Sequence, residues 1–269
     1  MTMNAKIGFL GAGRMASAIA GGMVKNAFIQ DNILFYDCSE AAAGAFEAAV
    51  GAKKCADPAA MAEACDAVLL AVKPQYLSEA LKPLTGLLKN KLVISIVAGV
   101  KLEKLAALTG ASRIVRVMPN TPALVGEGAA VYAASAGAEK SDIELADKIF
   151  SSVGTALQLS ENYLDAVTAV SGSGPAYVFE FIQAMADGGV AEGLPREIAL
   201  KLAAQTVLGA ATMVLKTGAH PQQLKDNVTS PAGTTSRALE VMAARGFSGI
   251  VMQSVRAAAE RSRELGGRK

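Results

Sequence analysis

The sequence predicts an α/β fold, in which a doubly wound sheet in the first half of the chain is followed by an all-helical second half. Short apolar runs alternate with helical patterns in the first half. Several of these runs have no polar alternation, as expected for parallel strands that helices cover on both faces. Strand patterns stop near residue 159, so we predict two domains, at residues 1–160 and 161–269.

The predicted elements follow in chain order from these patterns. The helical segments Met15–Asn26 and Glu40–Val50 separate the first strands. In the second half, prolines mark helix starts, because a proline in the first turn loses no needed hydrogen bond. The predicted strands are Lys6–Leu10, Ile33–Tyr36, Ala67–Val72, Leu92–Val97, Arg113–Met118, Ala129–Tyr132 and Thr155–Leu159.

One predicted helix, Ile198–Leu215, is apolar on nearly every face. A surface helix of a monomer keeps one polar side. This helix is therefore either the centre of its own domain or covered by another subunit. Because the helical half is short, we favour an interface between subunits and predict an oligomer.

Composition excludes several classes of protein. Of the 269 residues, 52% are hydrophobic and 19% are charged, and the net charge is +2. These values argue against disorder and against a nucleic-acid partner. No uncharged run reaches the roughly 20 residues that span a membrane, and the N-terminus does not resemble a signal peptide. We expect a cytoplasmic protein with no membrane partner.

The cysteines and the histidine limit the chemistry further. Cys38, Cys55 and Cys65 form no CxxC pair, which disfavours a disulfide framework or a zinc ribbon. The single histidine, His220, excludes a site with several histidine ligands. We predict no metal site.

A glycine-rich turn follows the first strand. The run GAGRMA begins at Gly11, which permits the tight turn, and Gly13 lets the backbone approach a pyrophosphate. Arg14 and Met15 begin the next helix, whose free N–H groups favour an anion. This arrangement predicts a Rossmann-type dinucleotide site, and the alternative is a purely structural glycine turn.

Asp37 ends the second strand, about 20 residues beyond this run, where an acid that binds the cofactor ribose is expected. A carboxylate suits a free ribose 2′-OH and repels a 2′-phosphate, so the chemistry favours NAD(H). The alternative is that Asp37 caps the next helix and points away.

Three later loops follow predicted strands, at the sheet edge where open α/β sheets bind ligands. The first holds Val72, Lys73 and Pro74, the second holds Ala98 and Gly99, and the third holds Asn120. Lys73 either contacts the cofactor or is a solvated loop lysine. Asn120 either bonds the cofactor or only shapes its turn.

The helical half contains one polar stretch of small residues, from Asp226 to Ser236. Gly233 and Thr234 stand where a helix begins, which would make a second anion site. The alternative is an elaborate helix cap.

Five motifs lie along the whole chain. They are IGFLGAGRM at residues 7–15, AVKP at 71–74, MPNTP at 118–122, DAVTAVSGSGPAY at 165–177 and LKDNVTSPAGTT at 224–235. Together they closely resemble the pyrroline-5-carboxylate reductase family, and the SGSGPAY and SPxGxT blocks are its most specific parts. The resemblance implies a Rossmann domain followed by a helical dimerisation domain, with homodimers that can assemble into larger rings.

The resemblance also implies the ligands. The substrate would be 1-pyrroline-5-carboxylate, and the cofactor would be NADP(H) or NAD(H), which leaves the preference indicated by Asp37 open. Thr235 would face the ring nitrogen as the catalytic hydroxyl, and Glu161 would lie near the bound ligand. The remaining substrate-binding residues would be Ser230, Gly233 and Thr234, and Asn227 would join the cofactor-binding set.

This reaction explains how a chain with one histidine can be an enzyme. A protonated cyclic imine is already electrophilic, so the protein need not supply a strong acid, and His220 is expected to begin a helix. Two alternatives are a related hydroxyacid dehydrogenase and a non-catalytic nucleotide-binding module. The dehydrogenase would need a lysine on the first long helix of the second domain, and residues 174–193 contain none.

Overall fold

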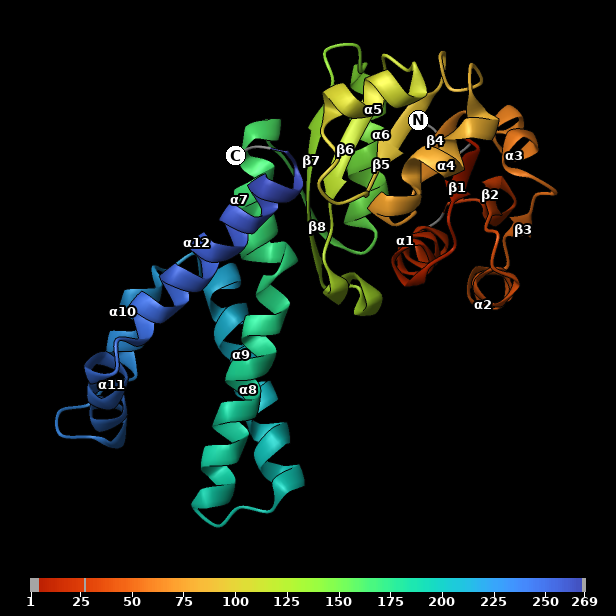
Figure 1. Ribbon diagram of the computed structural model, residues 1–269. Coiled ribbons are helices and arrows are strands. Elements are labelled where there is room, and N and C mark those ends of the chain that lie inside the picture. The colour runs from red at the N-terminus through yellow and green to blue at the C-terminus, as the bar shows by residue number, and fades with distance from the viewer. Residues whose placement is uncertain (1–4, 27, 268–269) are drawn as a thin grey trace. The chain divides into compact units, whose positions relative to one another are not determined.

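The computed structural model describes residues 5–26 and 28–267, which divide into two compact units (Figure 1). The first unit comprises the residues up to Ser173 and those from Ala258 onward, and the second is Gly174–Ala257. The boundary predicted at residue 160 therefore differs from this division. The end of the chain contacts the first unit, where the Ser262 hydroxyl donates to Asp165 Oδ1 at 2.8 Å.

One eight-stranded sheet forms the centre of the first unit. It is parallel except that β7 runs antiparallel to β6, with β8 parallel to β7. The predicted doubly wound sheet is confirmed, but β3 was not predicted because its two residues are lysines without an apolar pattern. In spatial order the strands are β3 (Lys53–Lys54), β2 (Ile33–Tyr36), β1 (Ile7–Leu10), β4 (Ala67–Leu70), β5 (Leu92–Ser95), β6 (Ile114–Met118), β7 (Gly128–Ala134) and β8 (Gly154–Gln158).

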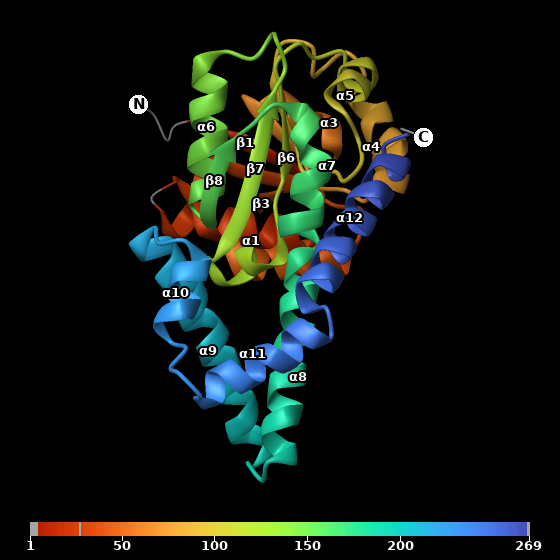
Figure 2. The ribbon, with the colours of Figure 1, turned by 90° about the vertical axis from the view of Figure 1, so that its left-hand side faces the viewer.

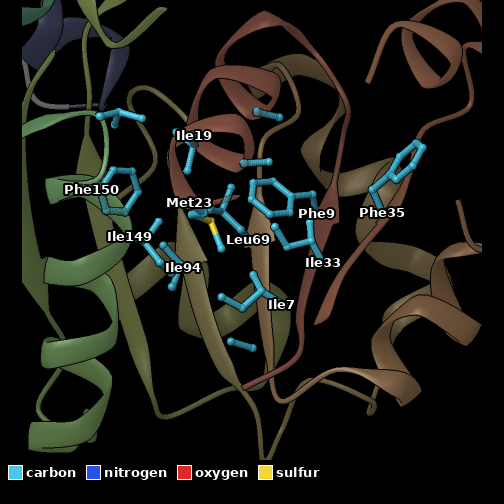
Figure 3. Close-up of a cluster of buried hydrophobic side chains, with 14 of the residues drawn as sticks. Ile7, Phe9, Ile19, Met23, Ile33, Phe35, Leu69, Ile94, Ile149 and Phe150 are labelled. Carbon is cyan, nitrogen blue, oxygen red and sulfur yellow. The ribbon is translucent and has the colours of Figure 1, made fainter. Parts of the chain in front are cut away.

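Helices cover both faces of this sheet, since successive strand residues point to opposite sides. On one face α1 (Arg14–Lys25), α2 (Glu40–Val50) and α6 (Lys140–Ser151) pack on a core that includes Phe9 and Leu69 (Figure 3). On the other face the core comes from α3 (Pro58–Ala64), α4 (Leu77–Leu81) and α5 (Leu102–Thr109). The burial of both faces explains the uninterrupted apolar strands.

Short helical turns connect and end this unit. They are η1 (Gln30–Asn32), η2 (Pro74–Tyr76), η3 (Lys82–Leu84), η4 (Thr121–Val125), η5 (Glu161–Tyr163), α7 (Leu164–Val167) and the π-helical turn η6 (Thr168–Gly172). π-helical turns are rare and occur often at functional sites. This one lies in the DAVTAVSGSGPAY motif and ends on the first two residues of SGSGPAY, which makes the motif a candidate part of the site.

The second unit is entirely helical in the described residues, as predicted. Its longest helices, α8 (Gly174–Ala191) and α9 (Arg196–Thr217), pack through small side chains, including Ala186 and Ala203. Two shorter helices, α10 (Pro221–Asn227) and α11 (Thr234–Ala244), are joined by an irregular loop (Figure 2). The last helix, α12 (Phe247–Leu265), begins in this unit and ends in the first.

Helix α9 exposes the apolar faces that its sequence predicted. Leu208 is 56% exposed and Leu215 is 84% exposed, and only Ala199 and Ala203 of this helix are buried. Among the described residues it alone is long and apolar enough to cross a membrane by length and composition. One such helix is weak evidence for a membrane span, because the core helix of a soluble protein passes the same test.

Candidate active site

The glycine-rich turn lies between β1 and β4, where the strand order reverses. Ligands of doubly wound sheets bind at this switch point. Gly11 has φ +102°, and a Cβ there would lie 2.8 Å from the carbonyl oxygen of Ala71. Only glycine fits, because both the backbone conformation and the close approach of β4 exclude a side chain.

Gly13 begins α1 in a different environment. Its backbone is extended, no side chain caps the helix, and a Cβ at Gly13 would meet no protein atom within 4 Å. Arg14 is exposed beside it, and Met15 is half-buried. The first-turn N–H groups of a helix lack partners within that helix. Uncapped donors beside open space fit the pyrophosphate of a dinucleotide.

Asp37 turns toward this glycine-rich turn. Its Oδ2 accepts from the Ala12 N–H at 2.7 Å, and its Oδ1 accepts from the Ser39 N–H at 2.8 Å. The residue that caps α2 is Ser39, whose hydroxyl accepts from the Ala42 N–H. The alternative in which Asp37 caps α2 and points away is therefore wrong for this structure.

The other predicted cofactor loops also end strands at this edge of the sheet. Lys73 and Pro74 are exposed after β4, and a Cβ on Gly11 would lie 3.2 Å from Val72 Cγ1. Ala98 is exposed after β5, and Gly99 has φ +75°. The structure thus brings the glycine-rich turn next to Val72, while the cofactor contacts of these loops stay predictions.

Asn120 is buried and holds the third loop in place. Its side-chain amide donates to the Ser171 carbonyl at 3.0 Å, and its Oδ1 accepts from the Ala129 N–H at 2.8 Å. A Cβ on Gly172 would collide with the terminal methyl group of Met118. The MPNTP and SGSGPAY motifs therefore pack directly against each other, which the sequence did not predict.

Glu161 is also held by the first unit. Its Oε1 accepts from the Leu102 N–H at 2.7 Å and from Arg116 Nη1 at 2.8 Å. The side chain of Arg116 is only 10% exposed. Sequence reasoning missed Arg116, although a charged residue inside the apolar run of β6 was a signal.

The predicted substrate residues lie in the second unit, on the loop that leads into α11. Gly233 caps this helix without a side-chain bond, and its N–H donates to the Ser230 carbonyl at 3.1 Å. A Cβ on Gly233 would collide with Ser230 Oγ, so any other residue there would require the Ser230 hydroxyl to turn away. Thr234 is exposed, and the half-buried Thr235 has no hydroxyl partner among the described residues.

Two residues near this loop serve α10. His220 Nδ1 accepts from the Gln222 N–H at 3.2 Å, so the histidine begins a helix, as expected. Asn227, the last residue of α10, is exposed and accepts from Gln223 Nε2 at 3.0 Å. Its assignment to the cofactor stays a prediction.

Comparisons with known proteins agree with the motifs. The family description "Pyrroline-5-carboxylate reductase dimerisation" matches residues 161–265, and "NADP oxidoreductase coenzyme F420-dependent" matches residues 6–99. The pyrroline-5-carboxylate reductase of Methanosarcina acetivorans is 48% identical over 98% of each chain. That of Glycine max is 46% identical over 96% of this chain and 95% of its own. The chain belongs to the pyrroline-5-carboxylate reductase family.

A solved pyrroline carboxylate reductase structure, from Plasmodium falciparum with NADP bound, extends the comparison to three dimensions. It is 37% identical, covers 99% of this chain and 100% of its own, and has a TM-score of 0.89. The family resemblance and the predicted fold class are thus confirmed. The match to the dimerisation domain of the pyrroline-5-carboxylate reductase family includes all of α9. The apolar faces of this helix are uncovered in a single chain.

Proposed function

We propose that this protein reduces 1-pyrroline-5-carboxylate to L-proline with NADH or NADPH, and that it works in the cytoplasm as a homodimer or a ring of dimers. One observation carries the proposal: relatives that match this chain over nearly its full length are pyrroline-5-carboxylate reductases. The glycine-rich turn at the switch point, which fits a dinucleotide, agrees with it. When bound, the nicotinamide cofactor would supply a hydride to the imine carbon, and the electron pair of the C=N bond would go to the nitrogen. The protonated imine of the substrate would thereby become a neutral secondary amine.

The chain's own residues would bind and orient the reactants. Gly11, Gly13 and Asp37 would hold the dinucleotide at the first unit. The uncapped start of α11 at Gly233 and Thr234 would bind the substrate carboxylate, since free helix N–H groups favour an anion. The Thr235 hydroxyl would contact the ring nitrogen as charge leaves it.

Catalysis of this kind depends on positioning rather than on acid strength. The described residues contain no cluster of three or more possible metal ligands. His220 Nδ1 is engaged in capping α10. A substrate that carries its own proton needs neither group.

The decisive experiment follows nicotinamide absorbance with 1-pyrroline-5-carboxylate and each cofactor in parallel. Oxidation of at least one cofactor, with L-proline as the product, is expected. Cofactor binding without oxidation would overturn the proposal and support the nucleotide-binding module. Turnover of a 3-hydroxyacid instead would support the dehydrogenase alternative.

A further inference from the structure

Glu161 joins two parts of the first unit that are distant in sequence. A single carboxylate oxygen, Oε1, accepts from the Leu102 N–H at 2.7 Å and from Arg116 Nη1 at 2.8 Å. Leu102 is the first residue of α5, and Arg116 lies in the middle of β6. We call this arrangement of three residues the Glu161 clamp.

The clamp gives α5 a cap that the helix lacks. The residue at its N-cap position is Lys101, whose side chain makes no capping bond. Lysine cannot accept a hydrogen bond, since its ammonium group only donates. Glu161 supplies the missing acceptor from another part of the chain, and its charge is favourable at a helix N-terminus.

The surroundings of Arg116 require a partner for its charge. Arg116 lies between Ser95 of β5 and Ala133 of β7, both fully or almost fully buried. Leu102 and Met118 pack against an adjacent apolar cluster that includes Leu164. A guanidinium group without its carboxylate partner is costly in such a place.

Each segment that the clamp ties carries predicted site residues. Leu102 follows the loop of Ala98 and Gly99 at the carboxyl end of β5. Met118 lies two residues beyond Arg116 and packs against Gly172. Gly172 ends the helical segment that begins at Glu161. The clamp therefore fixes the loop 98–101 relative to the paired MPNTP and SGSGPAY motifs.

We propose that Glu161 and Arg116 are positioning residues, which hold the loop 98–101 in the place where Ala98 and Gly99 would contact the cofactor. This inference rests on the proposed function. Glu161 acts through the Leu102 N–H and not by touching the substrate. The phosphate and adenosine ends of the cofactor, at Gly13 and Asp37, do not depend on the clamp.

Four variants separate capping from charge balance. Glu161→Ala removes the cap and strands Arg116, and Glu161→Gln keeps an oxygen that can accept from Leu102. Arg116→Met, combined with each of these, removes the stranded charge. The cap is then absent in Arg116→Met/Glu161→Ala and present in Arg116→Met/Glu161→Gln. We expect thermal stability to follow charge balance and kcat to follow the cap.

The Arg116→Met/Glu161→Ala variant is the decisive one. It should regain most of the stability lost in Glu161→Ala. Its kcat should stay about 10- to 100-fold below wild type, because misplaced reactants slow the reaction by that much. Arg116→Met/Glu161→Gln should recover both. The dissociation constant for the oxidised cofactor, measured by titration without substrate, should be nearly unchanged in all four variants.

Hydrogen exchange gives a readout that needs no activity. Amides of residues 98–104 should exchange faster in both Glu161→Ala variants than in wild type, with the rest of the sheet unchanged. Asp142→Asn, which breaks the Arg113–Asp142 pair elsewhere on the first unit, is the matched control. It should lose stability but keep kcat and the exchange of residues 98–104.

Several results would overturn the inference. Recovery of kcat together with stability in Arg116→Met/Glu161→Ala would reduce the clamp to a structural pair. A higher KM for 1-pyrroline-5-carboxylate in Glu161→Gln with unchanged kcat would place Glu161 on the substrate. Hydrogen exchange of residues 98–104 that is the same in the Glu161→Ala variants as in wild type would also overturn the inference. Wild-type protein that oxidises neither cofactor would overturn the proposed function, whereas the exchange test measures the clamp without any activity, so the two failures are distinguishable.

Discussion

The carboxylate of Asp37 accepts a hydrogen bond from the backbone N–H of Ala12, at 2.7 Å from Oδ2. The same carboxylate accepts from the Ser39 N–H through Oδ1, so a negative charge is fixed at the end of β2, beside the glycine-rich turn. Lys54, on the neighbouring strand β3, is paired with Glu40 at 2.7 Å. This edge offers a ribose an acceptor and offers a phosphate a repelling charge.

We therefore predict a preference for NADH over NADPH, measured as the ratio of the two kcat/KM values. Asp37→Ser should shift that ratio toward NADPH by about 10- to 100-fold, because juxtaposed like charges cost several kcal/mol. Asp37→Glu, which keeps the charge, is the control and should still disfavour NADPH. A wild-type enzyme that prefers NADPH would contradict this prediction.

The two glycines of the turn should fail in different ways when each is replaced by alanine. Gly11→Ala forces a side chain into positive φ and against the Ala71 backbone, so it should destabilise the fold by more than about 1 kcal/mol. Gly13→Ala meets no protein atom within 4 Å and should fold normally. Its Cβ would instead occupy space for the pyrophosphate and weaken cofactor binding. Thermal unfolding and cofactor titration distinguish the two, and equal stability loss would contradict the argument.

Asp142 should make the fold sensitive to acid. Burial opposes ionisation of this carboxyl, but hydrogen bonds from Arg113 and from the Glu139 N–H outweigh it and lower its pKa. The unfolded state then binds more protons at acidic pH, so this stability is present above about pH 3.9 and is lost as the pH falls through the lower folded pKa.

Asp142→Asn should cost about 2 kcal/mol at pH 7, because it removes the closer of the two carboxylate partners of a partly buried arginine and leaves only Glu139 at 4.0 Å. Urea unfolding at pH 7 and near pH 3 measures the effect. The difference between wild type and variant should shrink at the lower pH. A constant difference would mean that charge is not its source.

The sequence predicted the strands of the sheet well because both faces are buried, which leaves unbroken runs such as AVLL in β4. It did not predict β3, whose two lysines carry no pattern, nor the antiparallel direction of β7. Gly11 and Asp37 could be predicted because one local motif fixes both. The Glu161 clamp could not, since its partners Glu161 and Arg116 are 45 residues apart and only the folded sheet brings them together.

Thr235 should affect catalysis and not cofactor binding. Thr235→Ala should lower kcat by about 100-fold, the usual effect of removing one preorganised donor from a reacting centre. Thr235→Ser, which keeps the hydroxyl, should retain most of the activity. The cofactor dissociation constant should not change in either variant, because Gly11, Gly13 and Asp37, which would hold the dinucleotide, lie in the first unit. Equal kcat in the alanine variant and wild type would remove Thr235 from the mechanism.

The apolar faces of α9 should be buried between subunits. Leu208 is 56% exposed in the single chain, and the dimerisation family match includes it. Leu208→Glu should lower the assembly mass in light scattering, because an unpaired charge in an apolar interface is costly. The control Val125→Glu alters a side chain that is 77% exposed in the first unit, and it should keep the wild-type mass. Loss of assembly only in Leu208→Glu, with intact helicity by circular dichroism, would assign the interface to α9. A monomeric wild-type protein would refute it.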